Sequence, residues 1–206
     1  MNIALFGGSF NPVHNGHIAL MRRMKREFAL DKIIIMPTFV TPLKDNSFMA
    51  SAEDRYQMCL LAFENEEGIT VSNWEISRKT KSFTVDTLGY LKETCPEDNI
   101  FLITGADAFL QLPLWHKFED IFDIATILTV SRDSDGADIL NKAGERYRAQ
   151  FGCRYKISEN VVSNLSSTFV RDKISKGLDV GEDVPYTVYE YIKKKGLYGY
   201  QSSESL

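Results

Sequence analysis

Residues 7–17 have the sequence GGSFNPVHNGH, and the segments on either side of them decide the fold of this 206-residue chain. An apolar run at residues 3–6 precedes them and predicts a buried strand. Apolar side chains follow at helical spacing, namely Ile18, Met21, Met24 and Phe28. They predict a helix that begins near residues 15–16. The stretch is therefore predicted to join a strand to a helix, which is where open α/β sheets bind ligands.

The first half of this stretch suits the binding of a phosphate group. Gly7 and Gly8 lack side chains, so we expect the backbone to turn sharply there and to let a phosphate approach. The N–H groups of Gly8, Ser9 and Phe10 would then face the anion, beside the positive end of the following helix.

The second half adds two imidazoles. His14 and His17 lie on either side of Gly16, three residues apart, and are expected to reach one anion from the same side. A glycine pair or two nearby histidines alone more often serve packing or lie on the surface. Their combination after an N-terminal strand, in a chain with three histidines, favours a functional site. The spacing matches neither G-x-x-x-x-G-K-[ST] nor G-x-G-x-x-G.

The composition is that of an ordinary globular chain. Hydrophobic residues make up 44% and charged residues 25%, and a net charge of −4 argues against a broad nucleic-acid surface. Three widely spaced cysteines without a C-x-x-C pair predict neither a disulfide framework nor a zinc site. Because we find neither a membrane-spanning run nor a signal peptide, we expect a cytoplasmic protein. Its partners should be small molecules, with no nucleic acid and no membrane, and a homo-oligomer is left open.

Strands alternate with helices along the rest of the chain. Further strands are predicted at residues 32–37, 69–71, 100–103, 125–130 and 155–157, the second of them continuing through residues 73–76. Helices are predicted from Ser51, residues 82–88, residues 166–168 and Pro185, with a peripheral helix or mobile loop at 133–152. The helix from Ser51 should bury Tyr56, Cys59, Leu60 and Phe63. This alternation predicts an α/β fold with a doubly wound parallel sheet, as a single domain over residues 1–200 with a disordered tail at 201–206.

A second candidate anion site is the helix start at Ser166, Ser167 and Thr168. Hydroxyl residues at such a position usually serve as N-caps, worth about 1 kcal/mol. The same geometry also holds an anion, and Arg171, one turn into the helix, would add a fixed cation. Both interpretations stay open, although two such helix starts suit a triphosphate.

Three further residues are candidates for contacting a nucleotide. Asp107 follows Gly105 at the end of a buried strand, where an acid accepts hydrogen bonds from ribose or caps the next helix. Trp115 lies near the same strand end, where a tryptophan usually serves packing. Thr84 opens a predicted helix and, taken alone, belongs to an ordinary capped helix start.

The stretch GGSFNPVHNGH resembles the phosphate-binding H-x-G-H motif of the nucleotidyltransferase superfamily. Its G-G-[ST]-F-x-P form is similar to that of the bacterial nicotinate mononucleotide adenylyltransferases. Residues 166–171 resemble the S-[ST]-T-x-[IV]-R element of the family, and residues 105–107 its G-x-D element. The resemblance extends from Met1 to about Tyr198. It implies a Rossmann-like nucleotidyltransferase fold that transfers AMP from ATP to nicotinate mononucleotide, with Mg²⁺ accompanying ATP.

The resemblance also implies roles for individual residues. The catalytic residues would be His14, His17, Lys44 and Arg171. The ATP-binding residues would be Gly7, Gly8, Ser9, Phe10, Gly16, Ser166, Ser167 and Thr168. The acceptor would contact Thr84, Gly105, Asp107 and Trp115, with the pyridine ring stacked on the indole. No residue is assigned to a metal, since substrate phosphates are expected to hold Mg²⁺.

The chain departs from the family pattern at two positions. Family members commonly have Pro-His-Lys where this chain has Pro42-Leu43-Lys44, so Leu43 replaces the histidine. Phe83 stands where the family has tyrosine. Lys44 could equally be an ordinary solvated lysine. Alternatives therefore remain: another acceptor such as nicotinamide mononucleotide or phosphopantetheine, cytidylyl transfer, or a nucleotide-binding module without turnover.

Overall fold

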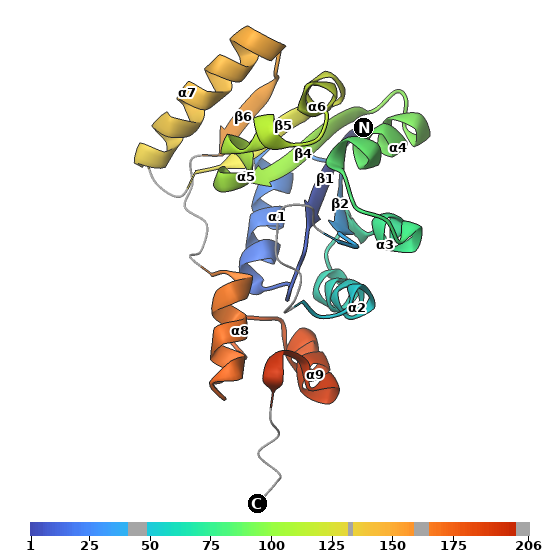
Figure 1. The fold of residues 1–206 in the computed structure, drawn as a ribbon, viewed down its shortest axis with the longest axis vertical. Helices are drawn as coiled ribbons and strands as arrows, with labels where there is room; N and C mark the ends of the chain where they lie inside the picture. The colour runs from blue at the N-terminus through green and yellow to red at the C-terminus, as the bar shows by residue number, and fades with distance from the viewer. Residues whose placement is uncertain (41–48, 132–133, 159–164, 201–206) are drawn as a thin grey trace, which may run out of the picture.

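The predicted strands form one parallel sheet in a computed structural model, which describes residues 1–40, 49–131, 134–158 and 165–200 (Figure 1). The strands are β1 (Asn2–Gly8), β2 (Lys32–Pro37), β3 (Ile69–Val71), β4 (Asn99–Gly105), β5 (Thr126–Val130) and β6 (Tyr155–Ser158). Their order is β3-β2-β1-β4-β5-β6, and each neighbouring pair is parallel. Because the chain fills one half of the sheet before it crosses to the other, the two halves meet between β1 and β4.

Helices cover both faces of this sheet. They are α1 (Asn15–Glu27), α2 (Ala52–Phe63), α3 (Trp74–Arg78), α4 (Thr84–Thr94), α5 (Ala106–Leu110), α6 (Phe118–Ile124), α7 (Ser134–Phe151), α8 (Ser167–Ser175) and α9 (Tyr186–Lys195), with short 3₁₀ turns at Leu112–Leu114 and Leu197–Gly199. The core on one face joins side chains of α1, α2, α8 and α9, and the other joins those of α4, α5, α6 and α7. The doubly wound α/β prediction is confirmed. No helix in the described part of the chain is long and apolar enough to cross a bilayer.

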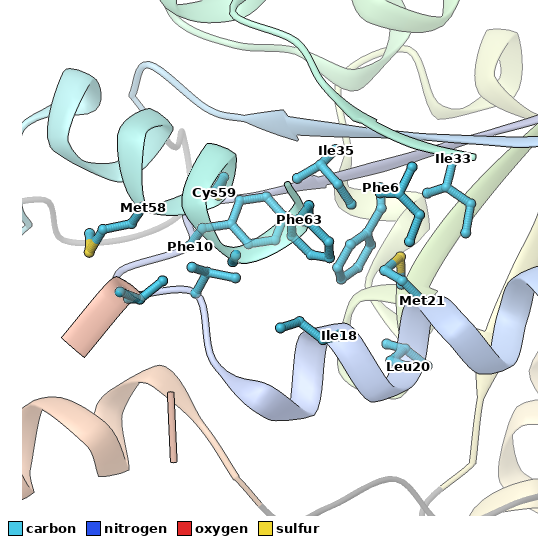
Figure 2. Close-up of a cluster of buried hydrophobic side chains, with 14 of the residues drawn as sticks. Phe6, Phe10, Ile18, Leu20, Met21, Ile33, Ile35, Met58, Cys59 and Phe63 are labelled. Carbon is cyan, nitrogen blue, oxygen red and sulfur yellow. The ribbon is translucent and has the colours of Figure 1, made fainter. Parts of the chain in front are cut away.

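Successive side chains of β1 point alternately into the two hydrophobic cores. Ile3 and Leu5 belong to one cluster, and Ala4 and Phe6 to the other, as expected for a strand covered on both faces. Figure 2 shows Phe10, from the loop after β1, packed among side chains of β2, α1 and α2. Burying a phenylalanine side chain contributes roughly 1.5–3 kcal/mol, so this ring anchors the loop against the core.

Three sequence predictions differ from the structure or are sharpened by it. Residues 73–76 do not extend β3, because the N–H of Trp74 bonds to the Ser72 hydroxyl and α3 begins there. Helix α2 buries Arg55, Met58, Cys59, Ala62 and Phe63, a stripe rotated from the predicted one, whereas Tyr56 and Leu60 are only half-buried. Residues 134–151 form a helix whose Leu140 and Tyr147 enter the core. The tail at 201–206 lies outside the described residues.

Candidate active site

Two adjoining clefts open where the sheet changes direction, at the carboxyl ends of β1 and β4. This position is the switch point at which doubly wound sheets bind ligands. The clefts have volumes of about 440 and 680 Å³ and share Phe6, Gly7, Gly8, Ser9 and Gly105 in their walls. We call the smaller one the phosphate cleft; it is also lined by Phe10, His14, Gly16, His17, Ser166, Ser167, Thr168 and Arg171. We call the larger one the aromatic cleft; it is also lined by Glu75, Phe83, Thr84, Asp107, Trp115 and His116.

The backbone does not turn at the glycine pair, contrary to the prediction. Gly7 and Gly8 remain in β1, paired with Met36 and Pro37 of β2. The turn lies at Phe10, whose φ of 46° is the left-handed region. A Cβ on Gly8 would lie 3.3 Å from the Phe10 ring, so the absence of a side chain there lets that ring fold back over the strand. In the described part of the chain, the N–H groups of Ser9 and Phe10 form no hydrogen bond.

The two imidazoles of the motif stack on each other. The ring centroids of His14 and His17 are 3.6 Å apart at an interplanar angle of 26°. The backbone N–H of His14 donates to Nδ1 of His17 at 3.2 Å, which places the proton of the neutral His17 ring on Nε2. A Cβ on Gly16 would lie 3.0 Å from Nδ1 of His14, so a side chain at this position would crowd the His14 ring of the stacked pair. The hydrogen bond and the stacking therefore fix the orientation of the pair, with Nε2 as the N–H donor of the neutral His17 ring.

His14 is neutral at physiological pH. Its side chain is 5% exposed, and this burial lowers its pKa to about 4, although the negative charge of Asp183 acts in the opposite direction. Nδ1 is buried and has no hydrogen-bond partner in the described part of the chain. His14 can therefore act on an anion through its dipole or a hydrogen bond and not through a positive charge.

The start of α8 faces the same cleft. Ser166 is the N-cap, and its hydroxyl accepts from the N–H of Phe169 at 3.1 Å. Ser167 uses its hydroxyl differently, because Oγ donates to the carbonyl of Pro12 at 2.8 Å and so ties the helix to the loop after β1. The capping interpretation is thus correct for Ser166, while the helix start still points its positive end at the cleft.

Arg171 supplies a cation to the phosphate cleft. Its Nη1 donates to the carbonyl of Asn11 at 2.8 Å, and its Nη2 to the hydroxyl of Thr168 at 3.2 Å. Among the residues that the structure describes, no carboxylate pairs with this guanidinium. The charge of Arg171 is therefore available to a ligand anion.

The aromatic cleft brings together Thr84, Asp107 and Trp115, as well as Gly105 at its boundary with the phosphate cleft. Thr84 is the first residue of α4, and Asp107 lies exposed in the first turn of α5. Phe83 packs against His116 with ring centroids 4.5 Å apart, so the phenyl ring forms a wall of the cleft without a hydroxyl group. A flat ring could enter the cleft beside these aromatic side chains, stack on the Trp115 indole and meet the N-terminus of α4.

Two buried charged residues were missed by the sequence analysis. Glu75, at 6% exposure, accepts from the hydroxyl of Thr87 at 2.6 Å, and burial raises its pKa. Arg55, at 1% exposure, donates to three backbone carbonyls. The available signal for Arg55 was its spacing to Met58, Cys59 and Ala62, which places a charged residue on the inward stripe of α2.

The remaining predicted site residue, Lys44, lies outside the described residues. The described residues contain no group of three or more His, Cys, Asp or Glu side chains that could hold a metal ion. In the described lining of the two clefts, the carboxylates are Glu75 and Asp107, both on the aromatic side.

Comparison with known proteins places the chain in a class. Residues 5–173 match the family model described as cytidylyltransferase-like. A probable nicotinate-nucleotide adenylyltransferase of Carboxydothermus hydrogenoformans is 35% identical over 200 residues, which cover 95% of this chain and 97% of the relative. One of Treponema pallidum is 34% identical over 204 residues, covering 96% and 99%. The chain belongs to the nicotinate-nucleotide adenylyltransferase family.

Solved structures show the same fold. Nicotinic acid mononucleotide adenylyltransferase of Plasmodium falciparum complexed with NaAD superimposes with a TM-score of 0.78 at 18% identity, covering 97% of this chain and 98% of the other. The same enzyme complexed with APC gives a TM-score of 0.77 at 19% identity.

Proposed function

We propose that the chain transfers AMP from ATP to nicotinate mononucleotide. A phosphate oxygen of the mononucleotide attacks the α-phosphorus of ATP, the bond from that phosphorus to the bridging oxygen breaks, and pyrophosphate leaves. The products are nicotinate adenine dinucleotide and pyrophosphate. Because the attacking oxygen is already anionic at neutral pH, no side chain has to remove a proton. Catalysis then depends on positioning and on neutralising the charge of the phosphates.

The phosphate cleft supplies this neutralisation. Nε2–H of His17 would donate to an oxygen of the α-phosphate, and Arg171 would add positive charge at the leaving pyrophosphate. The N–H groups of Ser9 and Phe10 and the first turn of α8 would bind the remaining phosphate oxygens. Lys44 would supply further positive charge to a phosphate, as the family resemblance implies.

The aromatic cleft would hold the acceptor. Its pyridine ring would stack on Trp115, and its carboxylate would meet the N–H groups at the start of α4 near Thr84. A helix N-terminus binds a carboxylate better than a neutral carboxamide, which favours nicotinate over nicotinamide mononucleotide. Asp107 would accept hydrogen bonds from a ribose.

Mg²⁺ would accompany ATP and supply charge neutralisation on its phosphates. The lining of the phosphate cleft fits a metal held mainly by substrate oxygens, since its described residues provide no carboxylate.

The observation that most supports this function is the meeting of the two clefts at Gly7, Gly8, Ser9 and Gly105. It would bring an acceptor phosphate in one cleft next to a triphosphate in the other. The test is pyrophosphate release with ATP and Mg²⁺, run in parallel with nicotinate mononucleotide, nicotinamide mononucleotide and phosphopantetheine. We expect release with the first and much less with the second. Release only with another acceptor, or ATP binding without release, would contradict the proposal.

A further inference from the structure

Arg55 of α2 is a buried cation whose partners are backbone carbonyls. Nη1 donates to Ser9 at 2.7 Å, Nη2 to Phe39 at 3.1 Å, and Nε to Ala50 at 3.2 Å. No carboxylate pairs with it in the described part of the chain, and burial lowers the pKa of the guanidinium. Burying a charge without a counter-ion costs desolvation free energy, and the three hydrogen bonds of Arg55 must offset that cost.

The bond to Ser9 determines the direction of the next amide. The carbonyl of Ser9 and the N–H of Phe10 belong to one trans peptide, and in such a unit the two groups point in opposite directions. Because Arg55 draws the carbonyl toward α2, the N–H of Phe10 must point away from α2. Ser9 and Phe10 both line the phosphate cleft, and this N–H has no hydrogen-bond partner in the described chain.

A second route links Arg55 to the cation of the cleft. The carbonyl of Ala50 accepts from Arg55, while its N–H donates to Oδ1 of Asn11 at 3.0 Å. The carbonyl of Asn11 in turn accepts from Arg171. Arg55 is therefore joined to both ends of the Ser9–Asn11 turn through bonds that leave little freedom to the peptides between them.

We propose that Arg55 is a positioning residue that orients the Ser9–Phe10 peptide so that the N–H of Phe10 donates to a polyphosphate oxygen. The inference rests on the proposed function in taking the triphosphate as the ligand. A lysine would keep the charge, but its single nitrogen cannot span the positions of Nε, Nη1 and Nη2.

The first test uses the unaltered protein and inorganic pyrophosphate. In amide NMR spectra we expect the Phe10 N–H resonance to move downfield during the titration, as a new hydrogen bond forms. A Phe10 resonance that stays in place while other cleft amides respond would overturn the proposal. This measurement needs no acceptor nucleotide, so it stays informative even if the chain fails to use nicotinate mononucleotide.

The second test compares Arg55→Lys with Arg22→Lys, a matched change at an exposed arginine of α1 that pairs with Glu66. Misplacing a reacting group by about 1 Å can cost on the order of 100-fold. For Arg55→Lys we expect kcat to fall roughly 10- to 100-fold with a smaller change in the KM for ATP, and the Phe10 response to pyrophosphate to disappear. Arg22→Lys should match the unaltered protein. If Arg55→Lys keeps the Phe10 response, or changes kcat only in proportion to its folded fraction in thermal unfolding, the proposal is wrong.

Discussion

The two clefts lie side by side but are constructed in different ways. The phosphate cleft is held by hydrogen bonds between distant segments, since Ser167 bonds to Pro12 and both Arg171 and Tyr198 bond to Asn11. The aromatic cleft has walls of packed rings, with the Phe83–His116 contact at its edge. Donors that meet developing charge must already be in place, whereas selecting a flat acceptor requires mainly shape and apolar surface. Changes in the first cleft should therefore affect kcat, and changes in the second should affect acceptor binding.

The largest expected effect is that of His17→Ala in the phosphate cleft. Removing one preplaced donor typically costs 100- to 1,000-fold, so we expect a loss of about that size in kcat with a much smaller change in the KM for ATP. Steady-state kinetics with both substrates varied give the two parameters. His116→Ala is the matched control in the aromatic cleft and should raise mainly the KM for the acceptor. If His17→Ala lowers kcat/KM only by raising KM, His17 binds the ground state and the transition state equally, and the prediction is wrong.

The second effect concerns folding and the burial of His14. Its pKa is lowered to about 4 in the folded state, so below the ordinary value of 6.5 the unfolded chain binds a proton that the folded chain does not. The free energy of unfolding should therefore fall as pH drops from 6.5 toward 4, by up to about 3 kcal/mol from this group. Urea unfolding of the unaltered protein and of His14→Gln across this range measures the contribution of His14 to the free energy of unfolding. Parallel curves for the two proteins would contradict it, and His116→Gln serves as the exposed control.

A smaller effect is expected at Trp115. A stacked aromatic contact contributes about 0.5–1.5 kcal/mol, so Trp115→Ala should raise the KM for nicotinate mononucleotide by roughly 2- to 12-fold. The KM for ATP should not change, because Trp115 lines only the aromatic cleft. Ile139→Ala, at an α7 side chain that is 55% exposed and lines neither cleft, is the control. If Trp115→Ala changed only the KM for ATP, the assignment of the acceptor to the aromatic cleft and of ATP to the phosphate cleft would be wrong.

The smallest effect is a stability change at Glu75. Burial raises its pKa, so the folded chain keeps a proton that the unfolded chain releases above about pH 4.5. The unaltered protein should therefore lose stability relative to Glu75→Gln as pH rises through the raised pKa. The glutamine retains an oxygen that accepts from Thr87. Urea unfolding at pH 4 and pH 7 measures the difference between the two proteins, with Glu93→Gln on the exposed surface of α4 as control. A constant difference at both pH values would contradict this prediction.

The strands were predictable because a buried parallel strand is a continuous apolar run, as at residues 32–37. That His14 and His17 lie on the same side was likewise expected, because they are three residues apart across Gly16. The turn at Phe10 was not predictable, since a left-handed conformation at a non-glycine residue requires support from its surroundings. Arg55 was missed because arginine is rarely buried and its three partners are carbonyls, which every residue possesses.

The sequence by itself determined the order and type of the main elements and the presence of a strand–loop–helix junction with two imidazoles at residues 7–17. These features depend on hydrophobic periodicity and on residue types within a short segment, both of which can be read from neighbouring residues. Only the tertiary structure decided where peptide groups point and which buried charges are tolerated. Those properties depend on hydrogen bonds between segments far apart in the chain, such as the bond from Tyr198 to Asn11, and no local pattern encodes them.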